Sequence, residues 1–185
     1  MEKITKLKQE FETELIDGYL VPKNDKFLGE YIPEYNDRLK YISEFSGSFG
    51  FALILKNKNY LFVDGRYTLQ AKKQCGKSFT VITLPSKTPF NFLKNRKVSI
   101  GYDPKLFTKK TLSYFFNKKW NFKPLNLNLI DKIWKRKIKK NSDKFYILPN
   151  NSVGDNYDNK INRVIKNLKS KKADFHFISA SENNA

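Results

Sequence analysis

Few side chains in this chain of 185 residues have the type and spacing that chemistry requires. Metal-dependent hydrolysis needs carboxylates and imidazoles grouped around one or two ions, but the chain has a single histidine, His176. It lies in the alternating run Phe175–Ile178, where we expect a core strand, so we interpret it as structural. We therefore predict no metal site and no catalytic residue in this chain.

Nucleophilic catalysis and phosphate binding have equally little support. Cys75 is the only cysteine and has no histidine near it in the sequence, which is typical of a small buried apolar side chain. Gly47 lies between Ser46 and Ser48, with Gly50 three positions on, but this spacing fits neither the G-x-x-x-x-G-K-S/T phosphate loop nor a dinucleotide fingerprint. We predict that these glycines shape a turn.

A net charge of +18 raises nucleic-acid binding as an alternative function. Aromatic residues make up 15% of the chain and could stack on bases. However, the charge is dispersed and mostly carried by lysine, so the planar guanidinium fork that suits phosphates and base edges is scarce. Nucleic acid is therefore the weaker interpretation. The arginines are Arg38, Arg66, Arg96, Arg136 and Arg163.

Membrane insertion and secretion are not indicated either. No stretch approaches the roughly 18 to 20 apolar residues of a spanning helix, and the first residues carry charges where a secretory peptide needs an apolar run. A single cysteine cannot close an intramolecular disulfide. We expect a cytoplasmic protein with no membrane partner.

The elements that position the polar residues centre on a predicted β-hairpin. Phe51–Leu55 and Tyr60–Val63 are apolar and rich in strand formers. In the turn that follows, we expect Asp64 to accept backbone N–H groups and Gly65 to adopt a positive φ. The hairpin would thus deliver a fixed polar turn into a helix at 67–74.

The remaining patterns predict alternating helices and strands. Apolar residues at Ile4, Leu7, Phe11 and Leu15 indicate an amphipathic N-terminal helix. Further helices are expected from Asp37 and from Thr108. We predict an α/β fold, with a mixed β-sheet flanked by helices. The other expected strands lie at 20–22, 79–84, 97–101 and 122–125.

The last part of the chain is organised differently. A densely basic stretch at 134–143 indicates a solvated connector. Beyond it, one helical pattern around Ile161 and the strand at 175–178 are too little for an independent core. We predict a first domain at 1–140, a linker at 141–154 and the start of a second domain at 155–185.

Several motifs resemble the creatinase-type N-terminal domain of Xaa-Pro aminopeptidases, also called aminopeptidase P. Residues 43–50 are similar to its S-G-F-x-G-S-x-G stretch and residues 64–71 to its D-G-R-Y-x-x-Q-A stretch. The resemblance spans nearly the whole chain and implies that family's fold, which contains a ribonuclease H-like motif. Further matches are Glu30-Tyr31 and Arg38 to S-E-Y and a following Arg, residues 100–104 to I-G-x-D-P, and residues 128–134 to N-L-V-D-x-I-W.

The resemblance also implies a function. The family hydrolyses the bond between an N-terminal residue and a following proline, using two divalent ions, usually manganese, bridged by two Asp, one His and two Glu. None of those motifs occurs here, so we expect a truncated or proteolytic piece that needs no cofactor itself and lacks the C-terminal metallopeptidase domain. Such a piece would help oligomerisation and restrict substrate access. Its implied partners are the remaining domains of the same polypeptide, a second copy in a homodimer, and the peptide substrate of the full-length enzyme.

Two interpretations compete for the polar residues of these motifs. In the one we favour, opposite charges pair and lock the turns. In the other, Arg38 or Tyr67 faces the catalytic domain, of the same or a neighbouring subunit, and limits which peptides enter. The family often has a histidine in D-x-H-x-S-E-Y where this chain has Phe27, so the role of that histidine does not transfer. The structural motif comprises Glu30, Tyr31, Gly47, Gly50, Asp64, Gly65 and Arg66.

Other classes of protein stay open from sequence alone. Creatinase-type domains also occur as non-enzymatic binding modules, including the large subunit of a histone chaperone, although the basic charge argues against binding basic histones. The chain could equally be the N-terminal part of a prolidase or a creatinase.

Overall fold

A computed structural model describes residues 2–29, 31–93, 97–116, 120–136 and 146–179. The chain divides into two compact units, Met1–Ile138 and Lys139–Ala185, and each is described by itself.

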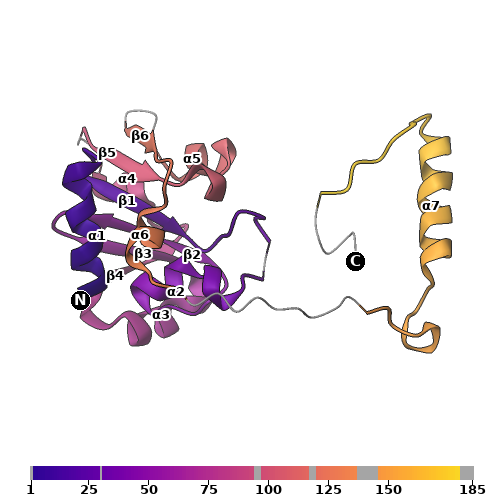
Figure 1. Cartoon of the computed structure of the whole chain (residues 1–185), viewed down its shortest axis with the longest axis horizontal. Coiled ribbons are helices and arrows are strands. Elements are labelled where there is room, and N and C mark those ends of the chain that lie inside the picture. Colours follow the sequence, from indigo (N-terminus) through magenta and orange to yellow (C-terminus); the bar gives the residue numbers. More distant parts are fainter. Residues whose placement is uncertain (1, 30, 94–96, 117–119, 137–145, 180–185) are drawn as a thin grey trace. The chain divides into compact units, whose positions relative to one another are not determined.

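The first unit is built on a six-stranded mixed sheet with the order β4-β3-β2-β1-β5-β6 (Figure 1). The β2 strand pairs antiparallel with both of its neighbours, and every other pairing is parallel. All strands except β2 therefore run in one direction and end at the same edge, called here the carboxyl edge. The strands are β1 (Gly18–Pro22), β2 (Gly50–Leu55), β3 (Asn59–Asp64), β4 (Thr80–Leu84), β5 (Ser99–Tyr102) and β6 (Asn121–Pro124).

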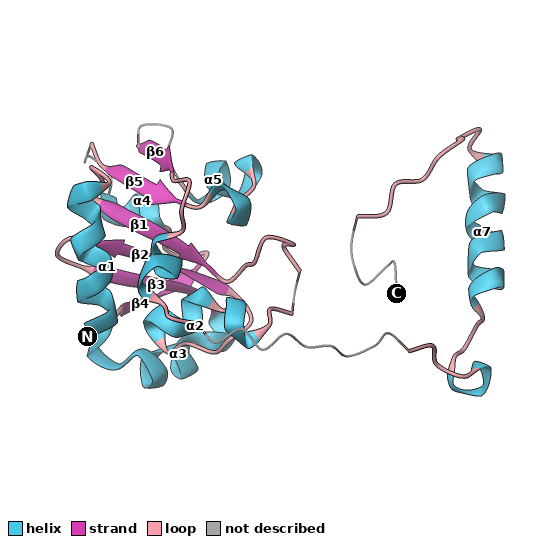
Figure 2. Cartoon of the chain, in the orientation of Figure 1, coloured by secondary structure: helices cyan, strands magenta, loops and turns pink. Residues whose placement is uncertain are grey.

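Helices cover both faces of the sheet, as the α/β pattern predicts (Figure 2). In β2, Ala52 and Ile54 belong to one buried cluster, whereas Phe51 and Leu53 belong to the other. This alternation buries both faces of the central strands. The first cluster packs on α1 (Glu2–Thr13), α2 (Arg38–Ser43), α3 (Thr68–Cys75) and α6 (Leu129–Ile133), and the second on α4 (Pro89–Leu93) and α5 (Lys109–Phe115).

Short 3-10 turns occur at several connections. Three of them lie at the carboxyl edge, at Glu34–Asn36, Gly65–Tyr67 and Pro104–Leu106, and two lie elsewhere, at Gly76–Ser78 and Asn150–Ser152.

The predicted hairpin and the fold class are confirmed, but two local expectations are wrong. The first helix ends at Thr13, and Leu15 has a φ of 50° and is 79% exposed. Ile16 takes the core position instead and is 2% exposed, because the chain reverses before β1. Gly65 does not adopt a positive φ, since it opens a 3-10 turn rather than a left-handed one.

In the second unit, the described secondary structure consists of the Asn150–Ser152 turn and α7 (Tyr157–Ser170). The helix begins where the Asn156 side chain accepts a hydrogen bond from the Asn159 N–H at 2.8 Å. The predicted strand at 175–178 is wrong: this segment is unpaired, and His176 is exposed rather than in a core. A strand is stable only beside a neighbour, and the described part of this unit offers none.

Candidate functional site

The same type of turn occurs at the carboxyl ends of β1, β3 and β5. In each turn, an aspartate side chain accepts a hydrogen bond from the backbone N–H two residues later. The distances are 2.9 Å for Asp25, 2.9 Å for Asp64 and 3.0 Å for Asp103. A cation follows each aspartate within two residues. The carboxyl edge is therefore a fixed backbone that presents Lys26, Arg66 and Lys105.

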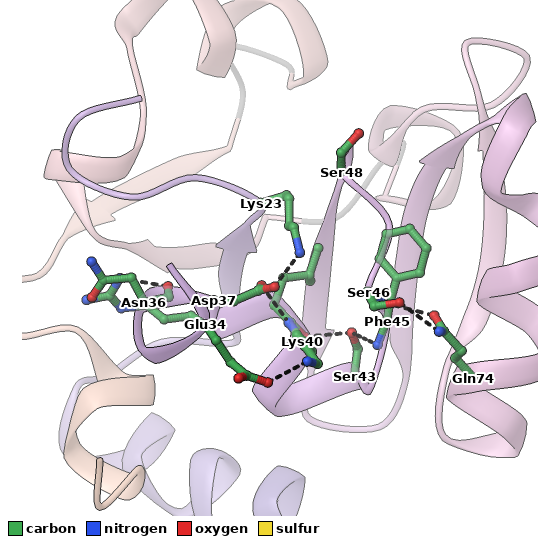
Figure 3. Close-up of polar contacts among 12 residues, drawn as sticks. Lys23, Glu34, Asn36, Asp37, Lys40, Ser43, Phe45, Ser46, Ser48 and Gln74 are labelled. Carbon is green, nitrogen blue, oxygen red and sulfur yellow. Dashed lines mark hydrogen bonds and ion pairs between the residues drawn. The ribbon is translucent and has the colours of Figure 1, made fainter. Parts of the chain in front are cut away.

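The loop between β1 and α2 is closed by a buried ion pair. The Lys23 ammonium group bonds one carboxylate oxygen of Asp37, and each side chain is only 9% exposed (Figure 3). The other oxygen of Asp37 accepts from the Lys40 N–H at 3.0 Å and caps α2. A single carboxylate thus both closes the loop and begins the helix.

Arg38 is tied to α6 rather than left open to solvent. Its Nε and Nη2 donate to the two oxygens of Asp131 at 2.7 and 2.8 Å, and its side chain is 10% exposed. Arg136 lies 2.9 Å from the same carboxylate and also donates to the backbone oxygen of Tyr35 at 3.1 Å. Two guanidinium groups therefore share one aspartate, which fixes α2, α6 and the preceding loop together.

The two glycines before β2 are required by close packing. A Cβ on Gly47 would lie 2.2 Å from Cζ of Phe45 and 2.9 Å from a ring carbon of Tyr67. A Cβ on Gly50 would lie 2.7 Å from the backbone oxygen of Phe62. Only residues without a Cβ fit at this corner, which explains the glycine motif.

Side chains of α3 hold the same corner. The Ser46 hydroxyl accepts from Gln74 at 2.8 Å, and Gln74 in turn accepts from the Ser46 N–H (Figure 3). The same hydroxyl accepts from Gln70 at 3.0 Å. The hydroxyl groups of Ser48 and Tyr67 lie 2.8 Å apart. The corner between 46 and 50 is therefore rigid and joined to the turn that follows β3.

Asp64 and Arg66 form the pair that the sequence suggested. Nη2 of Arg66 lies 2.6 Å from a carboxylate oxygen of Asp64. The pKa of Asp64 is lowered, chiefly by the hydrogen bond from the Arg66 side chain. The Arg66 side chain is nonetheless 75% exposed, and its guanidinium lies 5.3 Å from the ring centre of Tyr67. The guanidinium group is therefore exposed at the surface while it stays bonded within its own turn.

Two hollows flank the loop between β1 and α2. The larger has a volume of about 690 Å³, and its lining includes Lys26, Phe27, Arg38, Lys105 and Leu127. The smaller has a volume of about 340 Å³, and its lining includes Lys23, Leu28, Ser48, Phe49 and Arg66. Both open at the carboxyl edge, which makes this edge the candidate functional site.

The predicted site residues are only partly brought together. Asp64, Arg66 and Tyr67 form one group beside Ser48, whereas Arg38 belongs to the other hollow. Tyr31 is exposed, and Glu30 lies outside the described residues. Our sequence reasoning missed Asp131 as the partner of Arg38, although both lie in matched motifs.

The described residues show neither a cluster of metal ligands nor a membrane-spanning helix. They contain no group of three or more His, Cys, Asp or Glu side chains placed to hold a metal ion. Among these same residues, no helix has the length and apolar character needed to cross a membrane.

Comparison with known proteins identifies the family. Residues 3–129 match the model of the Creatinase/Prolidase N-terminal domain. The chain belongs to this family. Relatives named "Probable Xaa-Pro aminopeptidase P" are 29% identical over 184 residues in Pyrenophora teres f. teres and 30% identical over 182 residues in Penicillium rubens. Each alignment covers 92% of this chain but only 28% and 30% of the relative, so the chain spans under a third of their length.

Solved structures agree with this assignment. The X-prolyl aminopeptidase of Caenorhabditis elegans, described as a cytosolic enzyme with a di-nuclear active site, matches with a TM-score of 0.76 at 27% identity. That match covers 94% of this chain and 31% of the enzyme. The N-terminal domain of the Mycobacterium tuberculosis peptidase PepQ, at 20% identity and a TM-score of 0.56, shares the fold; the match covers 72% of this chain and 98% of that domain.

Proposed function

We propose that this chain is the non-catalytic N-terminal region of an Xaa-Pro aminopeptidase, and that the whole enzyme hydrolyses the N-terminal Xaa-Pro peptide bond. The named relatives and the Caenorhabditis elegans enzyme support this proposal. Two divalent ions, which we propose to be manganese, would polarise the peptide carbonyl and activate water. The described residues do not fit such a pair of ions, because they contain no suitable ligand group.

The proposed role of this region is to limit which peptides reach the catalytic domain, with the carboxyl edge facing that domain in the same or a neighbouring subunit of a homodimer. One observation carries this proposal: matched motifs from distant parts of the sequence converge on one edge. Tyr31, the corner at 46–50, the turn at 64–67, Asp103 and Asp131 all belong to matched motifs and follow, precede or pack beside the strand ends.

The remaining organisation is proposed on similar grounds. We propose a first domain at 1–140, a linker at 141–154, of which 141–145 lie outside the described residues, and the start of a second domain at 155–185. The enzyme would be cytosolic, as its Caenorhabditis elegans relative is described to be.

The test uses the full-length enzyme with two variants that break the same pair. Arg38→Ala and Asp131→Ala each remove the bidentate contact, and Asp131→Ala also removes the contact to Arg136, so a purely structural Arg38 predicts that Arg38→Ala loses no more stability and no more kcat/KM than Asp131→Ala. An access role predicts a larger loss of kcat/KM for Arg38→Ala at similar stability. Tyr67→Phe removes only the hydroxyl that contacts Ser48 and tests the second candidate in the same assay. Metal-dependent cleavage of Xaa-Pro peptides by the isolated chain would refute the non-catalytic assignment.

A further inference from the structure

We infer that the larger hollow at the carboxyl edge binds a carboxylate of the peptide substrate, downstream of the bond that is cleaved, through Lys26 and Lys105. This inference rests on the proposed function and names the substrate class that the edge would select.

The hollow carries surplus positive charge. Five cationic side chains and two carboxylates line it, and both carboxylates are already engaged. Asp103 accepts from the backbone N–H of Lys105 at 3.0 Å and from Asn128 at 2.9 Å. Asp131 accepts from the two arginines.

The lysines that line this hollow differ in whether they already have ion-pair partners. Lys132 bonds Glu10 and Glu14 at 3.0 and 2.9 Å, and these contacts raise its pKa, the contact with Glu14 most. Lys26 and Lys105 are exposed and have no ion-pair partner among the described residues. These two lysines can therefore receive an external carboxylate.

The surroundings of these lysines suit an extended peptide. Phe27 is 73% exposed and Leu127 is 65% exposed, so apolar surface lies beside the charge. A volume of about 690 Å³ is within the roughly 300 to 1,000 Å³ usual for ligand sites. Both lysines lie within aspartate-fixed turns, so their backbone is ordered before the peptide arrives, which reduces the entropy cost of binding.

A nucleic acid fits this hollow less well than a peptide carboxylate. The guanidinium group of Arg38 is bonded to Asp131, and that of Arg136 is bonded to Asp131, the Tyr35 carbonyl oxygen and the Asn36 side chain. Neither group is available for a bidentate phosphate contact. One face of the Phe27 ring is covered by the Lys26 ammonium group, 5.0 Å from the ring centre, which leaves less room for a stacked base. Two lysines also provide few of the many phosphate contacts on which nucleic-acid affinity depends.

The experiment compares two octapeptides that begin Ala-Pro and end in an amide, one with two central glutamates and one with two central glutamines. Isothermal titration with the 185-residue chain at low salt should show about fivefold tighter binding of the acidic peptide, and the preference should shrink as salt rises. The double variant K26Q/K105Q should lose the preference. The control K72Q/K73Q removes the same charge from exposed lysines of α3 and should keep it.

Several outcomes would overturn the inference. These are equal binding of both peptides, an equal effect of the control pair, or tight binding of a single-stranded oligonucleotide at physiological salt that K26Q/K105Q abolishes. In the full-length enzyme, K26Q/K105Q should raise KM for the acidic peptide only, with kcat unchanged. An enzyme that cleaves neither peptide contradicts the proposed function, whereas loss of the binding preference contradicts only the inference.

Discussion

Arg38 and Asp131 are joined by two parallel hydrogen bonds although they lie 93 positions apart in the chain. The pair connects the first turn of α2 to α6, and Arg136 shares its carboxylate. Because the Arg38 side chain is largely buried, removing one partner leaves the other charge poorly solvated.

We expect Arg38→Ala and Asp131→Ala each to lower the free energy of unfolding by about 1 to 3 kcal/mol, less than for a fully buried pair because Asp131 is partly exposed. Urea unfolding of both single variants and the double variant measures the coupling between them. A coupling of at least about 0.5 kcal/mol is expected for a direct pair. Strictly additive losses would show that the contact contributes nothing.

Gly50→Ala should destabilise the protein by about 1 to 3 kcal/mol, because the new methyl group would meet the backbone oxygen of Phe62, which cannot move without disturbing β3. Gly65→Ala is the matched control, since a Cβ there has no heavy atom within 4 Å and the backbone φ is not positive. In thermal unfolding, Gly50→Ala should lower Tm clearly more than Gly65→Ala does. Equal shifts in Tm would contradict the packing argument.

Ile16→Ala should cost about 2 to 5 kcal/mol, because this side chain is almost wholly buried beneath the sheet. Leu15→Ala, one position earlier, should change stability by less than about 0.5 kcal/mol because Leu15 is exposed. Chemical denaturation of the two variants is the measurement. A larger loss of stability for Leu15→Ala than for Ile16→Ala would contradict the end of α1 at Thr13 and support the longer apolar helix face expected from sequence.

Burial raises the pKa of the Cys75 thiol to about 11, and nearby Ser43 partly opposes the shift. The unfolded thiol loses its proton near pH 8.5, so between about pH 8.5 and 11 the unfolded state binds fewer protons than the folded state. The free energy of unfolding should therefore fall as pH rises through this window. Comparison with Cys75→Ala isolates the thiol: the stability difference between the two proteins should shrink from pH 8 to pH 10.5, and a constant difference would contradict the prediction.

The sequence predicts most of the first unit because its information is local. Strands such as Phe51–Leu55 show strand-forming composition, and Asp37, Asp64 and Thr108 make the caps that their positions suggest. The turn motifs likewise predict the turns at the carboxyl edge. Strands, caps and turns depend on neighbours within a few residues, which a single sequence displays directly.

What the sequence does not predict depends on distant contacts. The partner of Arg38 is chosen by how α2 and α6 pack, and the exposure of Leu15 follows from a chain reversal rather than from helical period. The segment at 175–178 has a strand-like pattern, but the pattern cannot supply the neighbouring strand that pairing requires.

The aspartate turns at the strand exits have a consequence for substitution. Each turn is closed by a side chain of its own segment, so the backbone there does not depend on the identity of the residues it displays. Lys26 or Lys105 can therefore be substituted one at a time while the strands and turns of the sheet keep their structure. The charge presented at the carboxyl edge can therefore change while the turns and the sheet beneath them keep their geometry.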